Sequence, residues 1–187
     1  MLKTRAHRPM ATTPKHAVHT SAQAVLLAAA ALSLGMAVYV LDRQAPALWL
    51  WPASWALGSA GSAHTRWFGS AGEWLPSAVH AYAFCMLSLA LLRPAAHPRA
   101  QTLAVCCGWW LLGSAFELAQ HPSWSHRLAA ALPAWAGHVP VLDHLGAYVV
   151  RGTFDQRDLA ATSAGCLAAG VNWRWLRAAA GREGERT

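Results

Sequence analysis

The chain has 187 residues, of which 55% are hydrophobic and only 12% are charged, about half of the roughly 25% charged content of an ordinary soluble domain. Its net charge of +7 comes from basic residues at the chain ends and in short connections, without the aromatic-interleaved basic face that a nucleic-acid partner needs. These features argue against a soluble domain and against nucleic-acid binding. They predict an all-α, polytopic membrane helix bundle.

The first predicted transmembrane helix runs from Ala22 to Leu41, after a polar amino-terminal segment (residues 1–21). About 20 residues without a charge are enough to cross a hydrocarbon core of roughly 30 Å. A cleaved signal peptide would have a shorter apolar core of about 7–15 residues, and no clean small-x-small cleavage site precedes Asp42. We therefore expect a retained membrane anchor.

A tryptophan-rich loop is predicted from Arg43 to Pro76, where prolines and glycines interrupt the chain too often for a membrane span. Amphipathic indole rings favour the head-group layer of a bilayer. Within this loop, Ala47 to Leu57 is predicted either as a short interfacial helix or re-entrant turn, or as a lid packed over the helix bundle. The tryptophans of the loop are Trp49, Trp51, Trp55, Trp67 and Trp74.

The second and third spans are predicted at Ser77–Leu92 and Gln101–Gln120, joined by a short turn that contains Arg93. The third span carries Glu117, the one carboxylate inside an apolar run. An acid at the centre of a bilayer helix costs roughly 2.5–3.5 kcal/mol on insertion scales. Because Glu117 lies about 24 Å along its helix, near the edge of the hydrocarbon core, we expect its charge to reach water.

A second interfacial loop is predicted from His121 to Arg157, and the fourth span from Asp158 to Trp175. In the fourth span, Ala161, Gly165 and Ala169 repeat at four-residue spacing, which lets a neighbouring helix approach closely. We therefore expect this helix inside the bundle, and the same small-residue face permits a homodimer.

Sidedness follows from the count of basic residues on alternate sides of the spans. Ten Lys and Arg residues lie in the amino-terminal segment, the turn after the second span and the tail, whereas five lie in the two long loops. The positive-inside rule then places both termini in the cytoplasm, with residues 22–176 as the membrane domain and residues 177–187 as a basic tail. We expect a multi-pass protein of the inner (plasma) membrane of a bacterium.

The four cysteines all lie in apolar runs and lack Cys-x-x-Cys spacing: Cys85, Cys106, Cys107 and Cys166. They indicate neither a zinc or redox site nor an exported disulfide framework, and act as small hydrophobic residues. The predicted spans lack paired histidines suited to haem, and no G-x-S-x-G elbow supports serine chemistry. We expect neither a cofactor nor a bound metal.

Polar side chains gather where three predicted helix ends meet on the outer side of the membrane. Glu117 shares a helical stripe with Gln120 and Gly113, and the missing side chain of Gly113 leaves room for a partner group or ligand. The predicted ligand-binding cluster consists of His80, Glu117, Gln120, Asp155 and Asp158.

Each member of this cluster also has a structural interpretation. Glu117 with Gln120 fits a helix-to-helix hydrogen-bond clamp, and Asp155 and Asp158 fit a helix amino-terminus. His80 fits an interfacial histidine, a partner of Glu117 or a metal ligand. The side-chain types also suit a divalent metal or an acid–base carboxylate pair, but no fixed-spacing motif supports either.

Three short motifs occur in a fixed order: a helix starting with His80, then Glu117-x-x-Gln120, then Gly152-Thr-Phe-Asp155-x-x-Asp158 leading into a Gly165-containing helix. This pattern resembles the VanZ-like family of small membrane proteins over roughly Ser77 to Gly170. Family members commonly have Gly-Arg and, one turn into the helix, an Asn, where this chain has Gly152-Thr153 and Thr162. Arg151 and Arg157 are the candidates to replace the missing cation. The resemblance implies an integral membrane protein linked with the cell envelope; the founding member is associated with resistance to the glycopeptide antibiotic teicoplanin.

These observations predict a non-enzymatic protein that contacts membrane lipids and whose outer polar cleft recognises a lipid head group, an envelope precursor or a partner protein. The alternative is a membrane enzyme that acts on a lipid-linked substrate, with Glu117 and either Asp155 or Asp158 as acid–base groups. Proton or ion translocation would need polar groups through the whole bilayer. Below Glu117 the spans offer only Thr162, Ser163 and Asn172.

Overall fold

The computed structural model describes residues 14–42, 67–92, 96–139 and 145–184, and every regular element within these ranges is helical. This confirms the predicted all-α class. The elements in chain order are α1 (Pro14–Asp42), α2 (Ala71–Leu91), α3 (Pro98–Ala119), α4 (Ser125–Ala130), the 3-10 helix η3 (Ala134–His138), α5 (Leu145–Arg151) and α6 (Gln156–Gly184).

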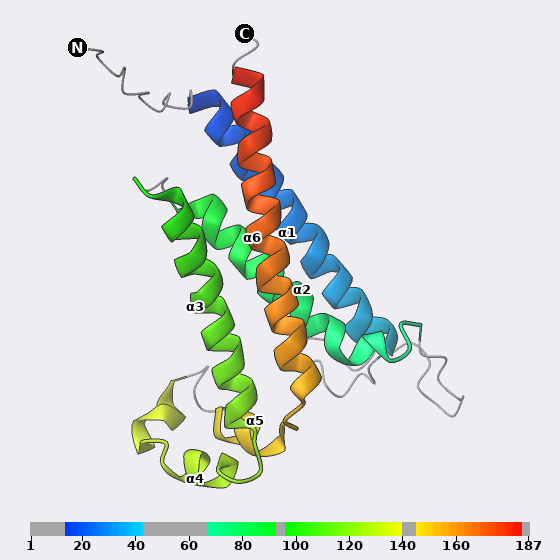
Figure 1. The fold of residues 1–187 in the computed structure, drawn as a ribbon. Helices are drawn as coiled ribbons and strands as arrows, with labels where there is room; N and C mark the ends of the chain where they lie inside the picture. The colour runs from blue at the N-terminus through cyan, green and yellow to red at the C-terminus, as the bar shows by residue number, and fades with distance from the viewer. Residues whose placement is uncertain (1–13, 43–66, 93–95, 140–144, 185–187) are drawn as a thin grey trace, which may run out of the picture.

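Four long helices, α1, α2, α3 and α6, form a bundle in which successive helices run in opposite directions (Figure 1). Helices α1 and α3 end, and α2 and α6 begin, at the end of the bundle where α4, η3 and α5 lie. We call this the short-helix end. The start of α1 and the end of α6 lie together at the opposite end (Figure 1).

Three helices are long and apolar enough to cross a membrane: Val18–Asp42 within α1 with a mean hydropathy of 2.3, and α2 and α3 with 1.4 each. They indicate a membrane protein. Helix α6 has 29 residues and, at about 1.5 Å per residue, runs the length of the bundle. Polar residues such as Asp158, Asn172 and Arg174 lower its hydropathy, and it is not among the three. The expected count of four spans is therefore not confirmed, and a fourth span stays a prediction.

Several helix boundaries differ from those expected. Helix α1 begins at Pro14 rather than Ala22, and α6 continues to Gly184 rather than ending at Trp175. Helix α2 begins at Ala71, so the last residues of the predicted loop are helical and Pro76 lies inside the helix. Pro76 is the sixth residue of α2 and has no N–H, so it removes one hydrogen bond of the helix, the one to the Gly72 carbonyl.

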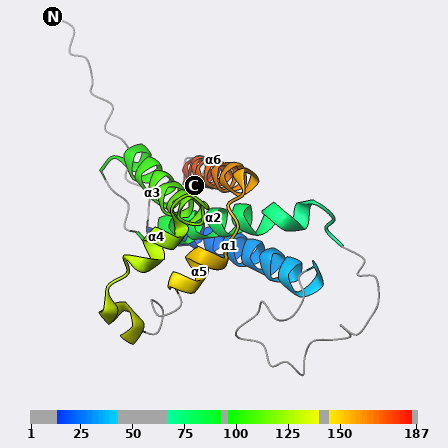
Figure 2. The same cartoon turned by 90° about the horizontal axis from the view of Figure 1, so that it is seen from below.

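The structure describes the two predicted interfacial loops to different extents. Residues 43–66, and with them the alternatives for Ala47–Leu57, lie outside the described residues. The second loop, His121 to Arg157, contains α4, η3 and α5. In the view from the short-helix end, these elements lie in front of the end of α3 and of one side of the bundle (Figure 2).

Helix α2 lies between α1 and α6 and packs on both through small side chains (Figure 2). Gly165 is buried, and a Cβ atom there would overlap the carbonyl oxygen of Ala78, so the two backbones nearly touch. Ala161 and Ala169 are buried on the same stripe. This confirms that the small-residue face of α6 lies inside the bundle. Because α2 of the same chain occupies that face, the predicted homodimer would have to use another.

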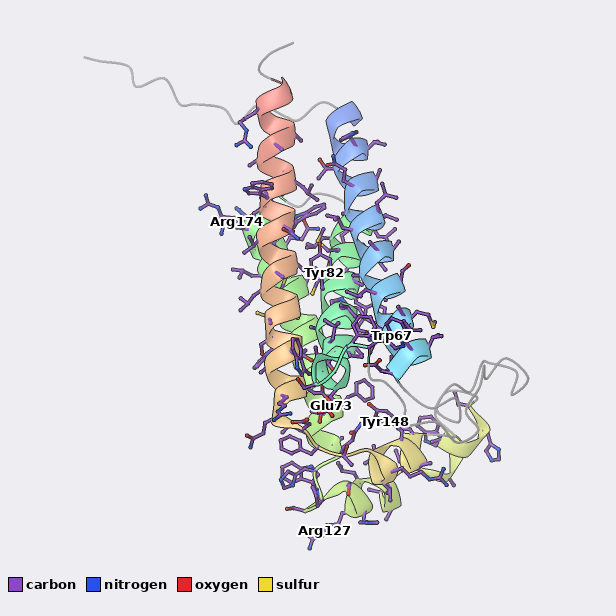
Figure 3. The ribbon with its side chains drawn as sticks, turned by 90° about the vertical axis from the view of Figure 1, so that its right-hand side faces the viewer. Trp67, Glu73, Tyr82, Arg127, Tyr148 and Arg174 are labelled. Atoms are coloured by element: carbon purple, nitrogen blue, oxygen red, sulfur yellow. The ribbon has the colours of Figure 1, made fainter. Side chains whose placement is uncertain are left out.

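All four cysteines are free thiols, and Cys85 and Cys166 are buried in the core that α2 and α6 share. Their sulfur atoms lie 3.8 Å apart. Polar side chains near the middle of the bundle bond to one another across helices: the Asn172 amide donates to the Tyr82 hydroxyl at 2.9 Å. Figure 3 shows Tyr82 midway along the bundle, with Glu73 and Tyr148 toward the short-helix end.

Candidate functional site

A cleft of about 580 Å³ opens between α2 and α3, and α1, α5 and α6 complete its walls. Helices α2 and α3 lie close together near the turn that joins them and diverge toward the short-helix end (Figure 1). The Trp109 indole donates to the Ser88 hydroxyl at 2.9 Å and ties the two helices at the deep end of the cleft.

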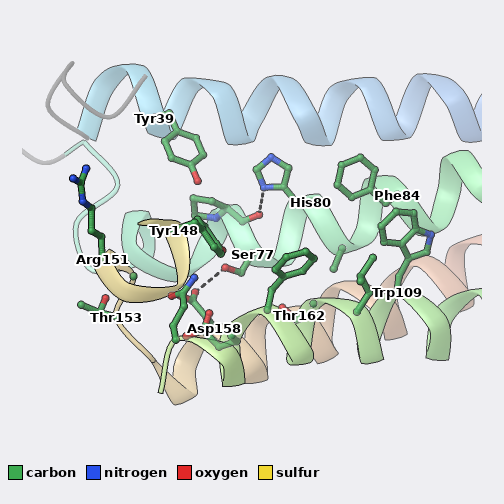
Figure 4. Close-up of a pocket in the computed structure, with 18 residues that line it drawn as sticks. Tyr39, Ser77, His80, Phe84, Trp109, Tyr148, Arg151, Thr153, Asp158 and Thr162 are labelled. Carbon is green, nitrogen blue, oxygen red and sulfur yellow. Dashed lines mark hydrogen bonds between the residues drawn. The ribbon is translucent and has the colours of Figure 1, made fainter. Parts of the chain in front are cut away.

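The lining of the cleft changes from polar to apolar along the bundle axis (Figure 4). Toward the middle of the bundle, Phe84 and Trp109 stack with ring centroids 4.9 Å apart, and Leu112 lies nearby on α3. The lining at the short-helix end is polar and includes Ser77, Glu117, Gln120, Tyr148, Arg151 and Asp158. A small amphiphile has the same division between its two ends.

Glu117 joins the end of α3 to the start of α6. One of its carboxylate oxygens, Oε1, accepts a hydrogen bond of 2.6 Å from the backbone N–H of Asp155. This is the one hydrogen bond that Glu117 makes through its side chain with the described residues, so Oε2 accepts none from them. The clamp interpretation is thus correct for one oxygen of Glu117, and the second oxygen is available to a ligand.

Asp155 and Asp158 stand at the start of α6, as expected. The Asp155 carboxylate accepts from the Arg157 N–H at 2.8 Å, a local bond typical of a residue that starts a helix. Asp158 lies in the first turn, where acidic side chains complement the helix dipole. Its Oδ1 also accepts from the Ser77 hydroxyl at 2.8 Å, which links α2 to α6. Asp158 lines the cleft, whereas Asp155 lines an adjacent hollow.

His80 lies on the α2 wall of the cleft, between Tyr39 and Phe84. Its Nδ1 is 2.7 Å from the Pro76 carbonyl oxygen, which only accepts, so Nδ1 carries the proton. In the neutral ring, Nε2 is then a hydrogen-bond acceptor, and no described residue donates to it. The expected alternative in which His80 pairs with Glu117 is not seen. Within the described ranges, no group of three or more His, Cys, Asp or Glu side chains is arranged to hold a metal ion.

Gln120 is the most buried member of the predicted cluster, at 7% exposure. It occupies the space beside Gly152, where a Cβ atom would overlap the Gln120 amide, so a larger residue at 152 would displace it. The Tyr148 side chain of α5 lines the same cleft. Burial raises the pKa of Tyr148, and the charge of Glu117 adds to this rise, so the phenol stays protonated at neutral pH.

The adjacent hollow, of about 400 Å³, is acidic: Asp42, Glu73, Asp155 and Asp158 contribute to its wall. Asp42 ends α1, where the helix dipole disfavours an acid, but its carboxylate accepts from the N–H groups of Trp67 and Phe68 at 2.7 and 3.0 Å. These two bonds hold the turn before α2, which bends at Gly69 with a φ of 53°.

The structure brings four of the five predicted residues, His80, Glu117, Gln120 and Asp158, to one cleft and puts Asp155 immediately beside it. Sequence reasoning missed Ser77 and Tyr148, and it named Arg151 only as a candidate for the cation of the family motif. Ser77 had a signal, because it lies three residues before His80 on the same face of a helix. Tyr148 had none, since the path of a loop between two spans cannot be derived from its sequence.

Comparison of the chain with protein-family models, with curated proteins and with solved structures gives no match. The resemblance to the VanZ-like family therefore stands on the motif residues alone. What the cleft can do follows from its own chemistry: Glu117, Asp158 and His80 present hydrogen-bond acceptors, Arg151 supplies a positive charge, and the deep end is apolar.

Proposed function

We propose that this chain is an integral membrane protein of the bacterial cell envelope whose cleft recognises the head group of a bilayer lipid or of a lipid-linked envelope precursor. The observation that carries the proposal is the change from polar to apolar lining along the axis of the candidate membrane helices. A ligand in a bilayer has the same polarity gradient along the same direction.

A small amphiphile suits this cleft better than a partner protein does. Ligand pockets of about 300–1,000 Å³ are typical of small molecules, and the volume of about 580 Å³ lies within that range. The resemblance to VanZ-like proteins supports a role in the envelope. By the positive-inside rule, both termini are cytoplasmic and the short-helix end faces outward.

We rank recognition above the enzymatic alternative because both carboxylates in the cleft already accept hydrogen bonds from fixed donors. The Asp155 N–H holds Glu117, and the Ser77 hydroxyl holds Asp158. Such bonds hold each carboxylate in one orientation, and a ligand-binding site needs side chains fixed in this way.

Lipid retained by the detergent-purified full-length chain tests the proposal, measured by mass spectrometry for wild type, Glu117→Gln and Glu117→Ala. Glutamine keeps an oxygen for the Asp155 N–H but removes the charge. We expect Glu117→Gln to keep normal membrane abundance and melting temperature while retaining about ten-fold less lipid, because a hydrogen bond to a charged group contributes about 1.5–3 kcal/mol.

Glu117→Ala should lose lipid and also some stability, since the partly buried N–H of Asp155 loses its partner. If Glu117→Gln retains as much lipid as wild type while Glu117→Ala loses both lipid and abundance, the carboxylate is only a clamp between α3 and α6, and recognition at this cleft is refuted.

A further inference from the structure

We infer that the cleft binds a long-chain amine, a lipid whose primary ammonium group is joined directly to its hydrocarbon chain. The chain lies along the apolar end of the cleft, and the ammonium group faces Glu117 and Asp158. This inference rests on the proposed function and names its ligand class. It follows from the order of the polar groups along the cleft, from their charge and from the exposure of the apolar end.

The order of the lining fixes the order of groups in the ligand. Phe84 and Trp109 form the apolar end of the cleft. Asp158 lies nearer the short-helix end, and Arg151 lies at the outermost part of the lining (Figure 4). Glu117 lies about 12 Å beyond Trp109 along α3, at about 1.5 Å per residue. A ligand whose chain occupies the apolar end therefore meets the two carboxylates before it meets Arg151.

A phospholipid in this orientation has its charges in the wrong order for the lining. Its phosphate lies between the hydrocarbon chains and the rest of the head group, so the phosphate would meet Glu117 and Asp158. An ammonium group beyond the phosphate would meet Arg151. Both encounters bring like charges together, and their repulsion is stronger inside a protein than in water. In a long-chain amine, the ammonium group is the first polar group after the chain, and there is no phosphate.

Three acceptors at the polar end suit the three N–H donors of a primary ammonium group. Glu117 Oε2 accepts no hydrogen bond from the described residues, and His80 Nε2 receives none from them either. The Asp158 carboxylate, whose Oδ1 accepts from the Ser77 hydroxyl, lines the same cleft. A quaternary ammonium group carries the same charge but has no N–H to donate, so these acceptors favour the primary form.

The charge of the polar end favours an ammonium group over a neutral donor such as a hydroxyl. The charges of Asp155 and Asp158 repel that of Glu117. The groups that hold the two cleft carboxylates, the Asp155 N–H and the Ser77 hydroxyl, are neutral donors. They orient the carboxylates without neutralising them. A cation that faces both carboxylates offsets their repulsion, which a hydroxyl group cannot do.

The apolar end accepts the hydrocarbon chain from the side. Phe84 on α2 and Leu112 on α3 stand on opposite walls and remain 38% and 46% exposed. Both belong to helices apolar enough to cross a membrane, so this exposure faces the hydrocarbon of a bilayer. A chain that enters between them continues onto Trp109 without leaving the apolar layer.

Titration of the detergent-solubilised full-length chain at neutral pH tests the inference, with bound ligand counted by native mass spectrometry. Dodecylamine carries its ammonium group on the chain, dodecyltrimethylammonium lacks the N–H donors, and dodecanol lacks the charge. Phosphatidylethanolamine carries its ammonium group beyond a phosphate. We expect dodecylamine to bind wild type about ten-fold more tightly than each of the other probes, a difference of about 1.4 kcal/mol.

Charge variants assign that preference to the cleft. Glu117→Gln and Asp158→Asn should each reduce dodecylamine binding to the level of dodecanol. Glu73→Gln, which removes the same charge outside the cleft, should preserve the preference. Arg151→Gln should strengthen dodecylamine binding, because it removes a like charge from the lining. Weaker dodecylamine binding in Arg151→Gln would overturn the placement of the ammonium group.

The apolar end has its own matched pair of variants. Leu112→Trp fills the apolar end and should weaken dodecylamine binding. The same change at the neighbouring exposed Leu111, which is not part of the lining, should leave it unchanged. Equal binding by the two variants would overturn the placement of the chain.

The outcomes separate this inference from the function on which it rests. Dodecyltrimethylammonium or dodecanol that binds as tightly as dodecylamine would overturn the ammonium assignment. Phosphatidylethanolamine that binds as tightly, and still depends on Glu117, would overturn the direct attachment of amine to chain and leave lipid recognition standing. If wild type does not bind dodecylamine saturably but retains lipid that Glu117→Gln loses, the inference alone is overturned. If that difference in retained lipid is also absent, the proposed function is overturned with it.

Discussion

Helix α2 meets its two neighbours α6 and α3 in opposite ways. Against α6 the backbones nearly touch, because Gly165 has no side chain where the Ala78 carbonyl lies. Against α3 the helices diverge and leave the cleft, closed at its deep end by Trp109 and Ser88. The tight interface fixes Asp158 opposite Ser77, and the open one exposes these groups to a ligand. One helix thus supplies both the rigid support and the accessible wall of the site.

The largest effect is expected from Gly165→Ala, which disrupts the close contact between α2 and α6. The added Cβ would overlap a backbone oxygen of α2, and because backbone cannot rotate away, α2 and α6 would have to separate. Overpacking of this kind costs typically about 1–3 kcal/mol, occasionally more. We expect lower membrane abundance and a lower melting temperature in detergent, measured by size-exclusion chromatography after heating.

Gly108→Ala is the matched control, since a Cβ atom at Gly108 of α3 meets nothing within 4 Å. Alanine is favoured over glycine inside a helix by about 1 kcal/mol, so this variant should be as stable as wild type or more so. Equal behaviour of the two variants would mean that the close approach of α2 and α6 does not support the bundle.

Ser77→Ala is expected to have an intermediate effect. It tests whether the interface of α2 and α6 orients the Asp158 carboxylate in the cleft. It removes the donor to Asp158 Oδ1 across the tight interface. The net loss for one hydrogen bond to a charged group is about 1.5–3 kcal/mol, less where water replaces the donor. We expect a modest drop in melting temperature and a larger drop in lipid retention, because the direction of the Asp158 carboxylate is no longer fixed.

Ser70→Ala is a control for Ser77→Ala, because Ser70 precedes α2 without making a side-chain cap bond. It should leave both readouts unchanged, and Ser77→Thr, which keeps a hydroxyl, should restore at least part of the lipid retention. A Ser77→Ala variant with normal lipid retention would show that Asp158 is oriented without this bond.

Sequence patterns predicted the parts of this molecule that depend on helical periodicity. Glu117, Gln120 and Gly113 share one stripe of α3, and Gly113 does admit a partner, since Thr162 of α6 lies against it. The four-residue spacing around Gly165 likewise predicted a close helix contact, because the absence of a side chain is visible in the sequence. Local rules of this kind need no knowledge of the rest of the fold.

What the sequence left out depends on tertiary structure. The start of α2 was missed because Pro76 was interpreted as a loop residue, whereas α2 contains this proline at its sixth position, with one backbone hydrogen bond fewer. Arg151 and Tyr148 reach the cleft only because α5 folds back against the short-helix end of the bundle, and no periodicity encodes that path (Figure 2). The prediction that α6 is a fourth span is not confirmed for a related reason. Polar groups of α6 such as the Asn172 amide hydrogen-bond to α2, and a hydropathy average does not detect such bonds.

The smallest effect is expected from Arg157→Ala, at the exposed edge between α2 and α6. Arg157 Nη1 lies 3.7 Å from Glu73 Oε2, and the two side chains are 66% and 48% exposed. Water screens such a pair, and exposed pairs contribute about 0–1 kcal/mol. A double-mutant cycle with Glu73→Ala, measured by thermal unfolding in detergent at low and high salt, should give a coupling energy below about 0.5 kcal/mol that falls with salt. A larger, salt-independent coupling would show that this ion pair, as well as the backbone contact at Gly165, holds α2 against α6. The pair would then partly offset the stability lost in Gly165→Ala.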